Sequence, residues 1–143
     1  MFDNLPPLNY PAIVVAAIAS IAIMAIWYGL LFGKKWMALQ GITEQPPKNK
    51  MIKSYVIATV ASLVMSYVLA NALAFAAYYL DISGLPSGLM SGFFNWLGFI
   101  APVTLGPVLW QGKSWKIWLI DAGYYLVALL AMGTILAMWP VAK

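Results

Sequence analysis

Residues 54–80 read SYVIATVASLVMSYVLANALAFAAYYL and contain no charged side chain. A helix needs about 20 apolar residues to cross a membrane, so this run is long enough to span one. Further apolar runs of similar length cover residues 11–32, 87–109 and 116–139. A transmembrane barrel would show short alternating segments instead. The sequence therefore predicts an all-α integral membrane protein in which residues 1–143 form a single four-helix domain, with short connections that make successive helices antiparallel.

Charged and reactive residues are scarce along the whole chain. Only 8% of its 143 residues are charged, against roughly 25% in soluble domains, and it has neither cysteine nor histidine. Thiolate nucleophiles, disulfides, a histidine base and the usual transition-metal ligands are thereby excluded. The acidic residues Asp3, Glu44, Asp81 and Asp121 fall on separate segments. We therefore expect a protein that is not an enzyme, has no cofactor or metal, and does not bind nucleic acid.

Lysines mark one side of the predicted membrane protein. Most of them lie in or beside the connections 33–53 and 111–115, namely Lys34, Lys35, Lys48, Lys50, Lys53, Lys113 and Lys116. The opposite side carries Lys143, Asp3 and Asp81. Because positive residues concentrate in cytoplasmic loops, both termini are predicted to be extracytoplasmic. With only Asp3 before it, the first apolar run is expected to remain as an anchor rather than act as a cleaved signal peptide.

Aromatic residues gather near both ends of the predicted helices. On the lysine side they are Trp27, Tyr28, Trp36, Tyr55, Trp110, Trp115 and Trp118, and on the other side Tyr10, Tyr78, Tyr79 and Trp139. Amphipathic rings settle at the depth of the lipid headgroups. We interpret these residues as interfacial belts that need no binding function.

Small residues recur at four-residue intervals in the second apolar run, at Ala58, Ser62, Ser66, Ala70 and Ala74. This spacing places all of them on one helix face. In lipid, such a ridge lets two helix backbones approach closely. The leading functional hypothesis is therefore a membrane protein that self-associates or joins a complex through this packing face, with membrane lipids and other subunits as its partners.

Polar residues inside the predicted spans form a candidate intramembrane site: Asp121, Tyr124, Tyr125, Asn71 and Asn95. Intramembrane carboxylates are rare and mark proton carriers, cation sites or partners of an amine. Asp121 lies only about one turn inside its helix, so pairing with a nearby lysine is the structural alternative. Asn71 and Asn95 are expected at similar depth, where they would either bond to each other or line a cavity.

The third apolar run is interrupted by proline. Pro102 and Pro107 lack an amide proton and crowd the carbonyls of Gly98 and Val103, so a kink is predicted there. Thr104 and Ser91 are candidates to satisfy the freed carbonyls, and broken helices can also hold ions. A second hypothesis is thus a small oligomeric transporter or channel for a proton, cation or small molecule that uses Asp121 and this kink. A third is a binder of lipid or quinone.

Several motifs resemble one known family. Asn9-Tyr10 and the stretch from Trp27 to Trp36, WYGLLFGKKW, are followed by Trp96–Pro102, WLGFIAP, by Ile120–Val127, IDAGYYLV, and by Met132–Leu136, MGTIL. In this order they resemble a bacterial membrane family known as domain of unknown function 1761, over residues 9–139. The resemblance implies a small four-helix protein of the bacterial inner membrane with no assigned activity, and it supplies no catalytic residues.

Overall fold

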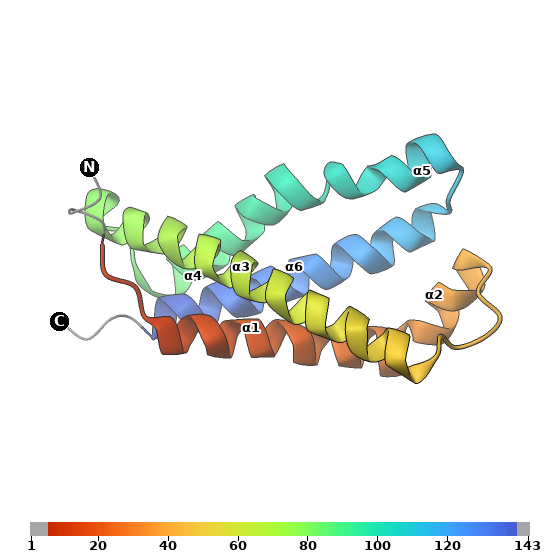
Figure 1. Cartoon of the computed structure of the whole chain (residues 1–143). Coiled ribbons are helices and arrows are strands. Elements are labelled where there is room, and N and C mark those ends of the chain that lie inside the picture. Colours follow the sequence, from red (N-terminus) through yellow and green to blue (C-terminus); the bar gives the residue numbers. More distant parts are fainter. Residues whose placement is uncertain (1–5, 140–143) are drawn as a thin grey trace.

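The structure is a computed structural model that describes residues 6–139, which are almost entirely helical (Figure 1). Its elements are α1 (Tyr10–Ala25), the π-helix η1 (Ile26–Leu31), α2 (Gly33–Gln40), α3 (Lys48–Leu80), α4 (Gly84–Asn95), the π-helix η2 (Trp96–Ile100), the 3-10 helix η3 (Val103–Leu105), α5 (Gly106–Gln111) and α6 (Trp115–Met138). No strand occurs within residues 6–139. The predicted all-α class is confirmed, while Asp3 and Lys143 lie outside the described residues.

Three segments are long and apolar enough to cross a membrane: Tyr10–Leu31, Lys48–Leu80 and Trp115–Met138. The bent pair Gly84–Ile100 and Val103–Gln111 is a fourth candidate. Helices of this length and composition indicate a membrane protein. Figure 1 shows the start of α1 and the end of α6 together at what we call the terminal end. The opposite end, with α2, the start of α3 and the turn after α5, carries the lysines and is called the lysine end.

Local sequence explains where the long helices begin. The Asn9 side chain accepts a hydrogen bond from the Ala12 amide at 3.0 Å, and Ser114 accepts one from the Lys116 amide at 3.2 Å. Both are favourable N-terminal caps. The connection 33–53, predicted to be a polar loop, contains α2, and α3 already begins at Lys48. Its lysines lengthen α3 because lysine is a good helix former in water.

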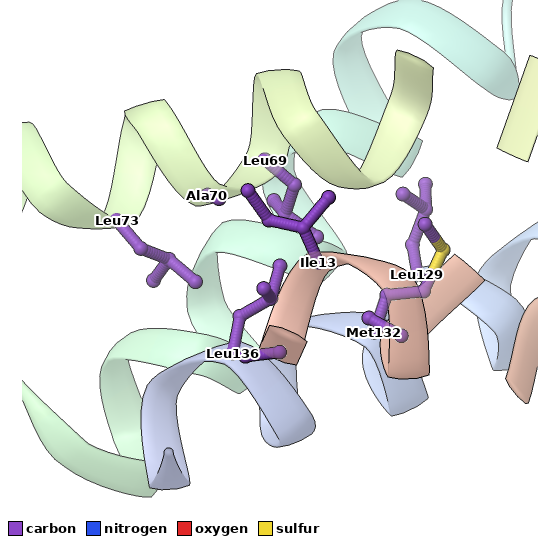
Figure 2. Close-up of a cluster of buried hydrophobic side chains, with 9 residues drawn as sticks. Ile13, Leu69, Ala70, Leu73, Leu129, Met132 and Leu136 are labelled. Carbon is purple, nitrogen blue, oxygen red and sulfur yellow. The ribbon is translucent and has the colours of Figure 1, made fainter. Parts of the chain in front are cut away.

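α6 is the central helix, since it contacts α1, α3 and α4. Its contact with α4 is made backbone to backbone, because a Cβ atom on Gly88 would lie only 2.3 Å from the Gly133 carbonyl oxygen. The main apolar core lies toward the terminal end, where α1, α3 and α6 meet (Figure 2). Its larger members are Ile13, Leu69, Leu73, Leu129, Met132 and Leu136. Toward the lysine end, Figure 1 shows α5 running apart from α3.

The small-residue ridge of α3 packs against the same chain. Ser62, Ser66 and Ala70 are buried, and Ala58 and Ala74 are partly buried. Ser66 Oγ donates to the Ile13 carbonyl at 2.8 Å, and Ser62 Oγ donates to Ser20 Oγ at 3.4 Å. α1 thus packs on the middle of the ridge, at Ser62 and Ser66, and self-association through this face stays a prediction. The four-residue spacing of small side chains indicates close helix packing, and within the chain the helix packed against these residues is α1.

Candidate functional site

Asp121 lies in the first third of α6, and its carboxylate is approached by two aromatic donors. Its Oδ1 accepts a hydrogen bond from Tyr28 OH at 2.6 Å and another from Trp36 Nε1 at 2.9 Å. Tyr28 belongs to η1 and Trp36 to α2. Two consecutive elements, η1 and α2, thus meet the carboxylate of α6, a helix that is far from them in the sequence.

No lysine pairs with this carboxylate. Within the described residues, no ammonium nitrogen lies within 4.0 Å of an Asp121 oxygen. The expected ion pair with Lys34, Lys35, Lys113 or Lys116 is therefore wrong. The physical reason is that η1 and α2 place Tyr28 and Trp36 over Asp121, whereas Lys34, Lys35 and Lys116 stay exposed.

The second carboxylate oxygen is open. Oδ2 of Asp121 accepts no hydrogen bond from residues 6–139. It is not enclosed either, because every fully buried side-chain oxygen and nitrogen among those residues has a partner. One oxygen is thus fixed by neutral donors, while the other is accessible to a proton, a water molecule or a cation.

The π-helix η1 brings two consecutive side chains onto α6. Beside Tyr28, Trp27 donates from Nε1 to the Ile120 carbonyl at 2.9 Å. Its ring lies over Gly123, where a Cβ atom would come within 3.2 Å of the indole. Adding a residue to a helical turn redirects the side chains that follow, and such π-segments are frequent at functional sites. Nothing in the apolar pattern of residues 11–32 indicates this local widening.

A second indole holds the other side of the same helical turn. Trp96, the first residue of η2, donates from Nε1 to the Ala122 carbonyl at 2.7 Å. The carbonyls of Ile120 and Ala122, on either side of Asp121, therefore each accept an indole N–H. On the lysine side, Trp27, Tyr28, Trp36 and Trp118 are hydrogen-bonded inside the chain, a role that an interfacial belt alone does not require. The belt itself stays a prediction. Tyr55, Trp110 and Trp115 are exposed.

Tyr124 and Tyr125 do not bond to Asp121. Tyr124 is buried, and its OH lies 3.2 Å from Ser20 Oγ, which also accepts from Ser62 Oγ. These three hydroxyls form a second polar cluster, and the Tyr28 and Tyr124 rings, 5.6 Å apart at their centroids, connect it with the Asp121 site. The ring of Tyr125 packs against that of Tyr124, with the two ring centroids 4.8 Å apart. Ser20 is not among the predicted polar site residues, because a small residue in an apolar run indicates helix packing and does not reveal a distant hydrogen-bond partner.

The two amides do not meet. Asn71 donates from Nδ2 to the Tyr67 carbonyl, and Asn95 donates from Nδ2 to the Ser91 carbonyl, both at 2.8 Å. Each amide is satisfied by the carbonyl four residues earlier in its own helix, as short polar side chains commonly are. The expected Asn71–Asn95 hydrogen bond is therefore wrong, and neither residue belongs to the Asp121 site.

The bend in the third apolar run lies between Ile100 and Val103 and measures 41°. Thr104 Oγ1 donates to the Ile100 carbonyl at 2.7 Å and to the Ala101 carbonyl at 3.2 Å. Trp118 Nε1 also donates to Ala101, at 3.1 Å. Thr104 thus satisfies carbonyls at the bend, but they are not the carbonyls of Gly98 and Val103 that it was expected to satisfy. The Ser91 hydroxyl donates to no carbonyl within residues 6–139. These two carbonyls are occupied by the chain itself and are not free to hold an ion.

The remaining residues of the predicted kink have simpler places. Pro107 stands in the first turn of α5, where its missing amide proton is tolerated. Gly98 lies in η2, and a Cβ atom there would meet nothing within 4 Å. Among the described residues, no group of three or more His, Cys, Asp and Glu could hold a metal ion.

Comparison with known proteins bears on the resemblance seen in the sequence. No curated protein and no solved structure matches the chain. A family described as "Protein of unknown function (DUF1761)" does match, over residues 11–137. This range contains Asp121, both of its aromatic donors and both π-helices. Since the match covers nearly the whole chain, the chain belongs to this family of proteins of unknown function.

Proposed function

We propose that the protein is an antiparallel four-helix bundle in a bacterial inner membrane. The bent pair of α4 and α5 serves as the fourth span, and the lysine end faces the cytoplasm. Supporting this orientation, all the lysines of residues 6–139 lie at one end, as expected for cytoplasmic loops. The terminal end, with Tyr10 and Trp139, then faces away from the cytoplasm.

We further propose that this bundle transports a proton or a small monovalent cation, with Asp121 as the binding group. One observation carries the proposal: the carboxylate has two neutral donors on one oxygen and, within residues 6–139, no cation beside it. A carboxylate in an apolar helix is costly unless a countercharge or a proton accompanies it. Because residues 6–139 provide no countercharge, an exchangeable ion or proton is the natural complement of the open oxygen.

Assembly through the ridge of α3 is less favoured by the contacts of the chain, because α1 packs against the middle of that ridge. A role without catalysis remains part of the proposal, since the four acidic residues stay on separate segments. Transport by a chain of this size still fits an assembly of several copies, with contacts on faces other than the ridge.

Flux through liposomes tests the proposal. The full chain is reconstituted in phosphatidylethanolamine and phosphatidylglycerol, a membrane potential is applied, and trapped dyes report internal pH and internal sodium or potassium. We expect flux for the wild-type chain and its loss in Asp121→Asn. Asp81→Asn is the matched control, because it removes the same charge from an exposed turn, and asparagine tolerates the positive φ of 55° at that residue.

Two results would overturn the proposal. One is equal flux in Asp121→Asn and the wild-type chain. The other is the absence of proton, sodium and potassium flux from wild-type liposomes whose protein is folded, as shown by its circular dichroism after reconstitution.

A further inference from the structure

A cavity of about 290 Å³ lies at the terminal end, away from Asp121. It is formed where residues 6–9 and the end of α6 meet the end of α3 and the start of α4. Leu73 and Leu136, which Figure 2 shows beside each other at this end, line it together with small alanines of α3. None of its described lining residues is charged. An ion is therefore a poor occupant, and an uncharged molecule is favoured.

One polar group in the cavity wall lacks a partner. Ser87, near the start of α4, is only 4% exposed and lines the cavity. Its hydroxyl forms no hydrogen bond with residues 6–139. Because every fully buried side-chain oxygen among those residues has a partner, Ser87 Oγ keeps some accessible surface, and Ser87 lines the cavity. A ligand oxygen within the cavity would supply the missing hydrogen bond.

The size of the cavity and the residues at its rim further restrict the class of ligand that fits. Its volume lies at the lower limit of small-molecule pockets, which are about 300 Å³ and larger, and is too small for a whole phospholipid. Tyr78 and Trp139 line it as well, and aromatic side chains pack well against flat rings. These features match a ring with few substituents better than a flexible chain.

We propose that this cavity binds an uncharged, carbonyl-bearing ring of the kind found in quinones, with a ring oxygen accepting a hydrogen bond from Ser87 Oγ. The apolar walls contributed by α3 and α6 surround the ring. This inference does not depend on transport at Asp121, because the two sites lie toward opposite ends of α6.

Tryptophan fluorescence provides the test. The full chain in phosphatidylcholine nanodiscs is titrated with a decyl-substituted 1,4-benzoquinone, which quenches indole emission, and Trp139→Phe identifies the signal that comes from the cavity. We expect saturable quenching. Ser87→Ala weakens binding about five-fold, as loss of one hydrogen bond predicts. Ala74→Leu, which fills the cavity, abolishes saturation.

Matched controls lie close by on the same helices. Ser91→Ala is one turn farther along α4, and Ala72→Leu lies on an exposed part of α3; neither residue lines the cavity. Both variants are expected to bind as the wild type does, and so is Asp121→Asn.

Three outcomes would overturn the proposal. Quenching that never saturates shows partition into the bilayer only. Equal affinities of Ser87→Ala and Ser91→Ala show that the hydroxyl takes no part. Saturable quenching by a phospholipid brominated on its acyl chain, lost in Ala74→Leu, would assign the cavity to a lipid chain instead. If Ala74→Leu does not fold, the affinities of Ser87→Ala and Ser91→Ala still show whether the Ser87 hydroxyl binds the ligand.

Discussion

Replacing Gly133 with alanine should loosen the closest helix contact in the chain. A Cβ atom at Gly133 would lie 2.2 Å from the Gly88 carbonyl oxygen, and the reverse substitution at Gly88 gives 2.3 Å. Farther along the same interface, a Cβ atom at Gly92 would lie 2.6 Å from the Leu129 carbonyl oxygen. All of these neighbours are backbone atoms, which cannot rotate away as a flexible side chain can.

The magnitude follows from two opposing effects. Ordinary van der Waals contact begins near 3.4 Å, so α4 would have to move away from α6 by about 1 Å, which loses contacts along the interface. Inserting a methyl group into a packed site costs typically about 1–3 kcal/mol. Alanine recovers about 1 kcal/mol of helix propensity relative to glycine. We therefore expect Gly133→Ala to lower the free energy of unfolding by up to about 2 kcal/mol.

A glycine series makes this prediction specific. At Gly98 a Cβ atom meets nothing within 4 Å, and at Gly123 it comes 3.2 Å from the Trp27 ring, which can shift. In thermal unfolding in detergent micelles, Gly98→Ala should match or exceed the wild type, Gly123→Ala should lose little, and Gly133→Ala should lose most. The double variant at Gly88 and Gly133 should lose less than the sum of the single losses, because one separation relieves both clashes. Equal midpoints for Gly133→Ala and Gly98→Ala would refute the reasoning.

The remaining predictions concern polar contacts. Ser66→Leu should destabilise the folded chain itself by about 2 kcal/mol or more in the same unfolding assay, because the ridge is packed and the hydroxyl bonds to Ile13; a stable variant would contradict this packing. The changes in unfolding free energy caused by Asn71→Ala and Asn95→Ala should add within about 0.5 kcal/mol in a double-mutant cycle, since the two amides do not touch. A larger coupling energy would show that they are in contact. Trp36→Phe, which removes the hydrogen bond from α2 to Asp121, should speed amide hydrogen exchange in α2 with no change in the middle of α3; unchanged exchange in α2 would show that this hydrogen bond does not hold α2 in place.

The predictable part of the fold depends on local properties of the chain. Uncharged apolar runs predict helices whatever their partners are, and proline at 102 predicts a break because it removes a backbone donor. The resemblance to the family rests on short motifs and is confirmed by the match over residues 11–137. Each of these features can be read within about one helix length of sequence.

The partners of the polar side chains could not be predicted in this way. Tyr28 and Asp121 are 93 positions apart, and the lysines next to Trp36 in the sequence were the more obvious partners. The ridge of α3 has the spacing of a packing face, but spacing does not distinguish α1 of the same chain from a second copy. Trp27 and Trp96, which lie in the two π-helices, bond to carbonyls of α6, and these contacts depend on the tertiary fold.

The two indole contacts next to Asp121 indicate which part of the site is able to move. Trp27 and Trp96 hold the carbonyls on either side of the carboxylate, so rotation of α6 would break both hydrogen bonds. Trp36, by contrast, belongs to a short helix with no fully buried residue, and an element with little buried surface opens at low free energy. If a proton or cation loads at Oδ2, we therefore expect α6 to remain in place while α2 separates from the carboxylate, which makes α2 the element that controls access.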